Sequence, residues 1–101
     1  MKSDHPTGEE LRPEQFELIA KALSDPRRVA LLEAIASEKC CECSTLTQQF
    51  PVSKATISHH IKELVRAGLV KAERHGQYLN CTVRRDVLEA YTKELLLRTD
   101  S

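Results

Sequence analysis

Apolar residues in the first third of the chain recur with the period of a helix. Phe16, Ile19 and Leu23 lie on one face of a predicted helix that begins at residues 12–13, because proline is tolerated at the first helical position. Asp25-Pro26 repeats this start signal, with a favourable N-cap residue before the proline. The apolar residues of this second helix surround much of its axis and predict burial on more than one side: Val29, Leu31, Leu32, Ile35 and Ala36.

Two further helices are predicted in the middle of the chain. The spacing of Thr45 and Gln48 matches a capping box and indicates a short helix that ends at Pro51. Ser53 is a favourable N-cap for the next helix, and Gly68 suits a left-handed C-cap at its end. The apolar residues of this helix fit the i, i+4, i+7, i+8 pattern of one buried face: Ile57, Ile61, Leu64 and Val65.

The last third of the chain predicts a hairpin followed by a helix. Extended stretches over 69–74 and 78–83 flank a turn at His75-Gly76-Gln77, and an amphipathic helix is expected from Asp86 onward, with an apolar face between residues 87 and 97. A short helix, a tight turn and a capped second helix are the ingredients of a helix-turn-helix. The hairpin stands where a winged helix carries its wing. The predicted fold is therefore mostly α with a small β-hairpin wing, a winged helix-turn-helix.

The chain has 101 residues, which corresponds to one domain. We expect this domain to span residues 13–98, and the polar, aperiodic residues 1–12 to form a flexible N-terminal arm. No apolar run is long enough to cross a bilayer. The first ten residues carry charges and a proline where a signal peptide would need an apolar stretch. These features predict a cytoplasmic protein that does not enter membranes.

The charge of the chain is balanced overall but unevenly distributed. Fifteen basic and fifteen acidic residues give a formal net charge of zero. Residues 1–50 hold six basic and nine acidic residues, whereas 51–101 hold nine and six, a net of −3 against +3. Within 51–85 the seven basic residues face two acidic ones, a net of +5. His59, His60 and His75 fall in the same window and can add charge as the pH drops. This window indicates a surface that binds a polyanion, although a solvated basic surface would look similar.

The helix that follows Ser53 leaves a polar face when its apolar residues turn inward. Short side chains in its N-terminal half would allow the backbone to approach a major groove closely, where such helices meet base edges. We expect double-stranded DNA as the partner of this face. The polar residues on it are Lys54, Thr56, Ser58, His59, Lys62 and Arg66.

Three segments of the sequence carry a family likeness. They are the run KALSDPRR at 21–28, the run SKATISHHIKEL at 53–64, and AGLV at 67–70 followed by RHGQY at 74–78. In this order they resemble the second-helix entry, the recognition helix, and the hinge and wing of the ArsR/SmtB metalloregulators, over roughly residues 14–98. The resemblance implies a homodimeric winged-helix repressor that leaves its operator when it binds an inducer. The first and last helices would then form the dimer interface.

The same resemblance suggests which residues touch DNA. In the recognition helix Lys54, Ala55, Ser58 and His59 match family positions that face the major groove, and Thr56 and Lys62 lie nearby. At the wing tip, Arg74, His75 and Gln77 would lie near the DNA backbone or the minor groove. We expect the wing to supply mostly salt-dependent phosphate attraction and the helix to supply sequence preference.

Three of the four cysteines cluster at Cys40, Cys41 and Cys43, just before the predicted helix-turn-helix. Thiols near a helix N-terminus favour the thiolate, which selects soft, thiophilic ions. Three sulfurs without a nearby histidine argue against a structural zinc site, which needs four ligands, unless Glu42 or a second chain supplies the fourth. On a regular helix or strand the three sulfurs do not converge, so a site that uses all of them requires an irregular turn. Gathering them would bend the entrance of the helix-turn-helix.

Family members that sense arsenite or antimonite carry a Cys-x-Cys pair at this place, which Cys41-Glu42-Cys43 resembles. Two features differ: Leu46 lies one residue further from the pair, and the usual third, downstream cysteine is replaced here by Cys40 as a candidate. The resemblance implies As(III) or Sb(III) as the inducer at Cys40, Cys41 and Cys43, with no cofactor required. The last helix offers Asp86 and Glu89 but no histidine, so the zinc site that some members keep there is expected to be missing.

Other functions are also consistent with parts of the sequence. Adjacent thiols can oxidise, so a thiol-redox or persulfide-responsive repressor of the same fold is the alternative. Cys81 stands alone in the second wing strand and is interpreted as a small apolar residue. No Ser/His/Asp arrangement, paired carboxylates or phosphate-binding glycine loop is present, so we do not expect an enzyme.

Overall fold

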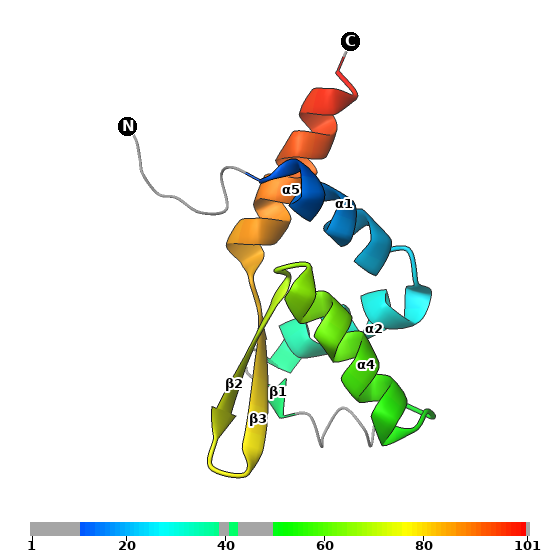
Figure 1. Cartoon of the computed structure of the whole chain (residues 1–101), viewed down its shortest axis with the longest axis vertical. Helices are drawn as coiled ribbons and strands as arrows, with labels where there is room; N and C mark the ends of the chain where they lie inside the picture. The colour runs from blue at the N-terminus through cyan, green and yellow to red at the C-terminus, as the bar shows by residue number, and fades with distance from the viewer. Residues whose placement is uncertain (1–10, 39–40, 43–49, 101) are drawn as a thin grey trace.

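The computed structural model describes residues 11–38, 41–42 and 50–100 and has the winged helix-turn-helix architecture that the sequence predicts (Figure 1). The arm predicted over residues 1–12, apart from Leu11 and Arg12, and the short helix predicted after Cys43 lie outside the described residues. The elements follow in the order α1 (Pro13–Ala22), α2 (Pro26–Glu38), β1 (Cys41–Glu42), α4 (Lys54–Arg66), β2 (Val70–His75), β3 (Tyr78–Val83) and α5 (Arg85–Arg98).

Both N-terminal helices begin at the predicted prolines. In α2 the backbone N–H of Arg27 donates to the Asp25 carboxylate over 2.8 Å, which satisfies one of the amides left open at a helix start. Leu31, Leu32 and Ile35 are buried as expected, whereas Ala36 is exposed. The apolar face of α2 is therefore narrower than the sequence pattern predicts.

Both ends of α4 are fixed by local hydrogen bonds. The Ser53 hydroxyl accepts from the Thr56 backbone N–H over 3.1 Å and caps the N-terminus. At the other end Gly68 has a φ of +85°. Its N–H donates to the Val65 carbonyl and the N–H of Leu69 donates to the Leu64 carbonyl. These two bonds form a Schellman motif, which confirms the predicted left-handed end of the helix.

The three strands form an antiparallel sheet in the order β1-β3-β2. The hairpin of β2 and β3 is the predicted wing, and it turns at Gly76, whose φ of +63° suits a tight two-residue turn. The sequence did not predict β1, which pairs with the other edge of β3 through Cys41↔Cys81 and Glu42↔Asn80. The strand β3 is therefore the middle strand of the sheet.

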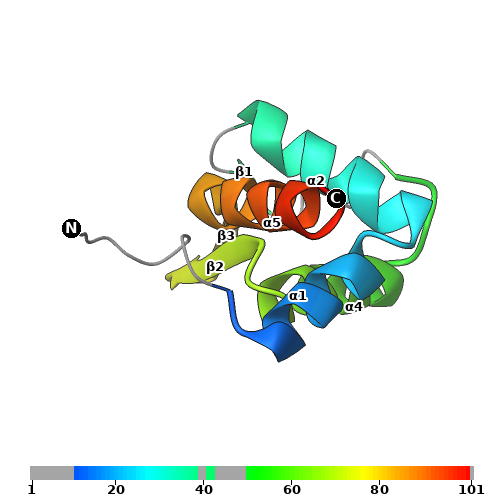
Figure 2. The ribbon, with the colours of Figure 1, turned by 90° about the horizontal axis from the view of Figure 1, so that it is seen from above.

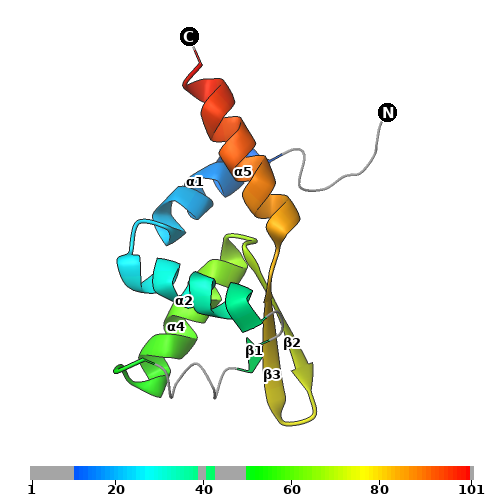
Figure 3. The same ribbon diagram turned by 180° about the vertical axis from the view of Figure 1, so that it is seen from behind.

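The core lies between the helices and the base of the sheet. Each main element contributes a buried residue to it: Ile19, Ile35, Leu64, Val70, Cys81 and Val87. Viewed along the long axis, α5 lies over the gap between α1 and α2 (Figure 2). The wing and α5 extend toward opposite ends of the protein, as the view from behind also shows (Figure 3).

One residue separates the wing from α5. β3 ends at Val83 and α5 begins at Arg85. The intervening Arg84 is held by its backbone N–H, which donates to the Leu69 carbonyl over 2.7 Å, and by its guanidinium, which bonds the Asp86 carboxylate at 3.0 Å. This junction closes the base of the hairpin and begins α5.

Candidate nucleic-acid interface

The helix α4 separates its residues into a buried face and an exposed one. Ile57, Ile61 and Leu64 are almost fully buried. Thr56 is half-buried because its side chain lies at the N-cap, where its hydroxyl is 2.9 Å from that of Ser53. The other residues predicted to face DNA are all exposed: Lys54, Ala55, Ser58, His59 and Lys62.

The tip of the wing is exposed and only partly basic. Arg74, His75 and Gln77 are all exposed there, as predicted for residues that approach DNA. Glu73 lies between them and the base of the strand, 3.1 Å from the Lys71 ammonium and 3.8 Å from the His75 imidazole. Lys71 is therefore partly neutralised. Among the described residues Arg74 has no such ion pair and remains available to a phosphate.

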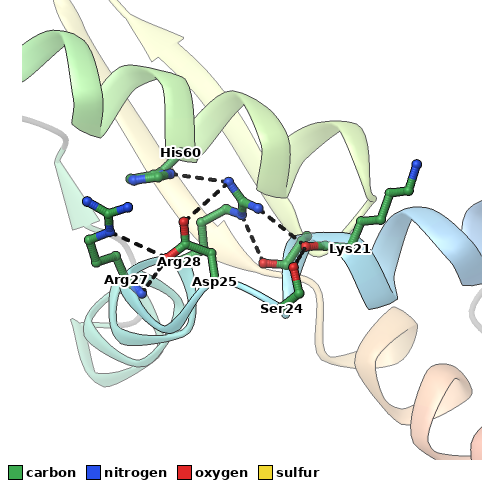
Figure 4. A network of polar contacts seen from close by, with 7 residues as sticks. Lys21, Ser24, Asp25, Arg27, Arg28 and His60 are labelled. Carbon is green, nitrogen blue, oxygen red and sulfur yellow. Dashed lines mark hydrogen bonds and ion pairs between the residues drawn. The ribbon is translucent and has the colours of Figure 1, made fainter.

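A polar network behind α4 joins it to α1 and α2 (Figure 4). The Arg28 guanidinium, from α2, donates to the Ala22 carbonyl over 2.9 Å and to the Lys21 carbonyl over 3.3 Å at the end of α1. It also lies 3.4 Å from Nδ1 of His60 on α4 and 3.9 Å from the Asp25 carboxylate. This one side chain of α2 therefore contacts both α1 and α4, which fixes the recognition helix relative to the two N-terminal helices.

His60 is buried on the inner side of α4, with 5% of its surface exposed. Its Nε2 has no hydrogen-bond partner among the described residues. Burial lowers the pKa of His60 below the ordinary histidine value, and the neighbouring Arg28 lowers it further, whereas the charge of Asp25 acts in the opposite direction. The sequence suggested that His60 could add positive charge to the DNA-facing surface. The structure instead buries His60 on the other side of α4, so it does not contribute charge to that surface. Asp25 has a lowered pKa because the Arg27 backbone N–H donates to its carboxylate.

Of the four cysteines, the structure describes Cys81 in full and the backbone of Cys41. Cys41 begins β1 and is directly opposite Cys81 in β3. Cys81 is fully buried, which agrees with its interpretation as a small residue of the core. Cys40 and Cys43 lie outside the described residues, so the convergence of the predicted trio stays a prediction. Within the described ranges no group of three or more His, Cys, Asp or Glu side chains could hold a metal ion.

Comparison with known proteins identifies the family. Residues 23–73 match the family model described as a helix-turn-helix domain. The arsenical resistance operon repressor of Staphylococcus aureus is 32% identical over 79 residues, which cover 74% of this chain and 75% of that protein. The chain belongs to the ArsR/SmtB family. The corresponding repressor of Staphylococcus xylosus is 37% identical over 62 residues, which cover 61% of this chain and 59% of that protein.

Solved structures support the same assignment. A crystal structure of an ArsR family transcriptional regulator superposes with a TM-score of 0.78 at 26% identity, covering 89% of this chain and 92% of the other. A Mycobacterium bovis domain described as a homodimeric winged helix-turn-helix superposes with a TM-score of 0.69 at 22% identity, covering 84% and 79%. This ArsR/SmtB protein is therefore a DNA-binding transcriptional regulator, which is not a class of enzyme. No helix in the described part of the chain is long and apolar enough to cross a membrane.

Sequence reasoning missed the Arg28–His60 contact in this ArsR/SmtB regulator. A signal for it was present: His60 follows Ile57 by three residues and precedes Leu64 by four. That spacing places it on the same helical face as the apolar residues. The sequence did not reveal which side chain would contact His60, and the structure shows that it is Arg28 near the start of α2.

Proposed function

We propose that the protein is a homodimeric repressor that binds a two-fold symmetric operator and is released when trivalent arsenic or antimony binds Cys40, Cys41 and Cys43. The observation that carries the proposed DNA binding is the exposed polar face of α4 beside a wing whose Arg74 makes no ion pair with the described residues. The inducer half is supported by the names of the staphylococcal relatives, which are repressors of arsenical resistance operons, and by the cysteine cluster.

The recognition helix enters the major groove through its N-terminal half in this proposal. Two residues lie at the edges of the contact, Thr56 and Lys62. The residues that face the bases are Lys54, Ala55, Ser58 and His59. Ala55 and Ser58 are short, so the helix can approach closely. Arg74, His75 and Gln77 contact the adjacent backbone or minor groove, where they add affinity that falls as salt rises.

The dimer is supported by apolar residues that the single chain leaves uncovered. Leu95, Leu96 and Leu97 near the end of α5 are 41%, 70% and 62% exposed. On the helix face of Leu95, Phe16 of α1 stacks against Tyr91 of α5 with ring centroids 5.0 Å apart, and the Arg98 guanidinium lies 3.8 Å over the Phe16 ring. Several exposed leucines at one end of a small domain favour burial in a second copy.

The proposed inducer site places thiolates just before the recognition helix in the chain. Trivalent arsenic and antimony are soft and prefer sulfur ligands. β1 begins at Cys41 and leads through residues 43–53 to the start of α4. A ligand that draws the thiols together therefore acts on the segment that leads into the recognition helix. A thousandfold loss of DNA affinity requires about 4 kcal/mol of coupling.

The decisive experiment measures release of labelled operator DNA by fluorescence anisotropy. Arsenite should dissociate the wild-type complex, and Cys41→Ser and Cys43→Ser should keep DNA binding but lose release. Glu42→Gln is the matched control, since it changes the same segment without removing a thiol. Failure of arsenite alongside release by a polysulfide would overturn the metalloid proposal and establish the persulfide-responsive alternative. Binding that ignores both salt and sequence would refute operator recognition itself.

A further inference from the structure

The tip of the wing carries an aromatic residue that neither the core nor the contacts proposed so far use. Tyr78 is the first residue of β3 and is 52% exposed. Within the described part of the chain its hydroxyl makes no hydrogen bond and its ring makes no ring contact. Tyrosine combines a large apolar ring with a polar tip, and for this reason it is enriched at surfaces that bind a partner.

The strand register determines on which face of the hairpin each residue of the tip lies. Opposite residues of an antiparallel pair share a face, and successive residues of one strand alternate between the two faces. Tyr78 is paired with His75, on the face opposite to that of the buried Cys81. Arg74 is paired with Leu79, on the same face as Cys81. The tip therefore has a phenol ring on one face and a guanidinium on the other.

The tip lies at the end of the protein where the recognition helix begins. The start of α4 at Lys54 and the turn of the hairpin are both at this end, whereas α5 finishes at the opposite end (Figures 1 and 3). This is the end that the proposed function assigns to DNA. Arg74, which makes no ion pair with the described residues, places a positive charge beside the ring of Tyr78. A duplex that contacts both α4 and the wing would present its sugar–phosphate backbone to this tip.

We propose that Tyr78 is a further DNA-contacting residue, whose ring packs on a deoxyribose and whose hydroxyl donates to a neighbouring phosphate oxygen. This inference rests on the proposed function, because it adds a residue to the same interface. Tyrosine hydroxyls are among the donors that bind phosphate and sugar. A neutral side chain releases no counterion, so its contribution to affinity does not depend on salt, unlike that of Arg74. The contact also carries no base information, so it strengthens binding to operator and scrambled DNA alike.

Affinity for operator and scrambled DNA, measured over a range of salt concentrations, tests the contact. Tyr78→Thr removes the ring but keeps a residue that favours strands. It should weaken binding about tenfold at every salt concentration and leave the slope of log affinity against log salt unchanged. Tyr78→Phe loses the hydroxyl bond alone and should weaken binding about threefold. For comparison, Arg74→Ala should reduce that slope by about one.

Thr82→Ala is the matched control for the wing strand. Thr82 lies on the same strand and the same face as Tyr78, four residues or about 13 Å closer to the base of the wing. Its substitution should leave DNA affinity at the wild-type value. Urea unfolding checks that each variant is folded.

The chain has only two tyrosines, which allows a direct measurement of the contact. With 3-fluorotyrosine in place of tyrosine, ¹⁹F NMR gives one signal for each, and Tyr91→Phe identifies the signal of Tyr78. Operator DNA should shift the Tyr78 signal and leave that of Tyr91, whose ring packs against Phe16, at its place.

Three results would overturn the inference while the wild type still binds operator. They are a folded Tyr78→Thr protein with wild-type affinity, a Tyr78 signal that DNA does not shift, and a loss of affinity on the operator alone, which would place the ring against a base. A wild-type protein that binds neither DNA would instead refute the proposed function.

Discussion

His59 and His60 are neighbours in the sequence but face opposite sides of α4. His59 is exposed on the side proposed to meet DNA, whereas His60 is buried beside Arg28. A step of one residue turns a helix by about 100°, so adjacent residues of one type can have unrelated roles. A substitution at His59 therefore tests the proposed DNA contact, whereas a substitution at His60 tests the buried side of the helix.

At the residue scale, we predict that His60 makes the fold sensitive to acid. Its pKa in the folded protein lies below the ordinary value of 6.5 because of burial. Just below that ordinary value the unfolded chain binds more protons at this histidine than the folded one, so the free energy of unfolding falls as the pH falls through about 6.5. Urea unfolding at several pH values measures this slope. His60→Gln should flatten this slope, and a slope equal to that of the wild type would contradict the prediction.

We also predict that His59 contributes to sequence preference. His59→Ala should weaken operator binding more than binding to scrambled DNA, by about 1–3 kcal/mol of discrimination, if its imidazole contacts a base edge. Lys71→Ala should change discrimination little, because Lys71 is paired with Glu73 on the wing strand. Anisotropy titrations with both DNA sequences measure the difference. Equal losses on both sequences would mean that His59 contacts phosphate alone.

Individual residues of α4 show how far periodicity predicts burial. Ile57, Ile61 and Leu64 are buried as expected, but Val65 is 39% exposed although it fits the same pattern. Val65 lies at the edge of the apolar face near the end of the helix, where the core no longer covers it. Apart from Thr56, which is half-buried at the N-cap, the polar residues of α4 proposed for DNA contact are exposed as predicted, because a helix that buries one face must present the other.

At the scale of elements, the two glycines with positive φ permit a matched test. An added Cβ at Gly68 would lie 2.6 Å from the Gln15 amide nitrogen, whereas none of the described atoms lies within 4 Å at Gly76. A left-handed backbone costs a non-glycine residue about 1–2 kcal/mol. We predict that Gly68→Ala lowers the free energy of unfolding by more than Gly76→Ala, as measured by urea titration. Equal losses would show that Gln15 moves aside without cost.

Elements with strong local signals are predicted best. The prolines, Ser53 and Gly68 mark helix ends to within a residue or two, since each fixes a backbone angle or a hydrogen bond locally. The wing strands are also found almost to the residue. β1 could not be predicted, because two residues show no alternation, and their extended backbone depends on pairing with a strand far along the chain.

At the scale of the whole molecule, we predict that α5 controls assembly. Leu97→Glu places a charge in an exposed apolar surface and should weaken the homodimer by at least about tenfold, which corresponds to 1.4 kcal/mol. Gln77→Glu adds the same charge at the wing tip and should leave the dimer intact while weakening DNA binding. Sedimentation equilibrium measures the first effect. A Leu97→Glu protein that stays dimeric would place the interface elsewhere.

The junction at Arg84 also limits how the sequence can change in length. An extra residue inserted at this non-helical position would move α5 relative to the sheet and disturb the bond that holds the Arg84 backbone N–H to the Leu69 carbonyl. The exposed leucines of α5 would then change position relative to the sheet, and the two wings of a dimer would lose their common spacing on DNA. An extra glycine after Gly76 would merely lengthen an exposed loop. Variation in length should therefore be tolerated at the hairpin tip and not at residue 84.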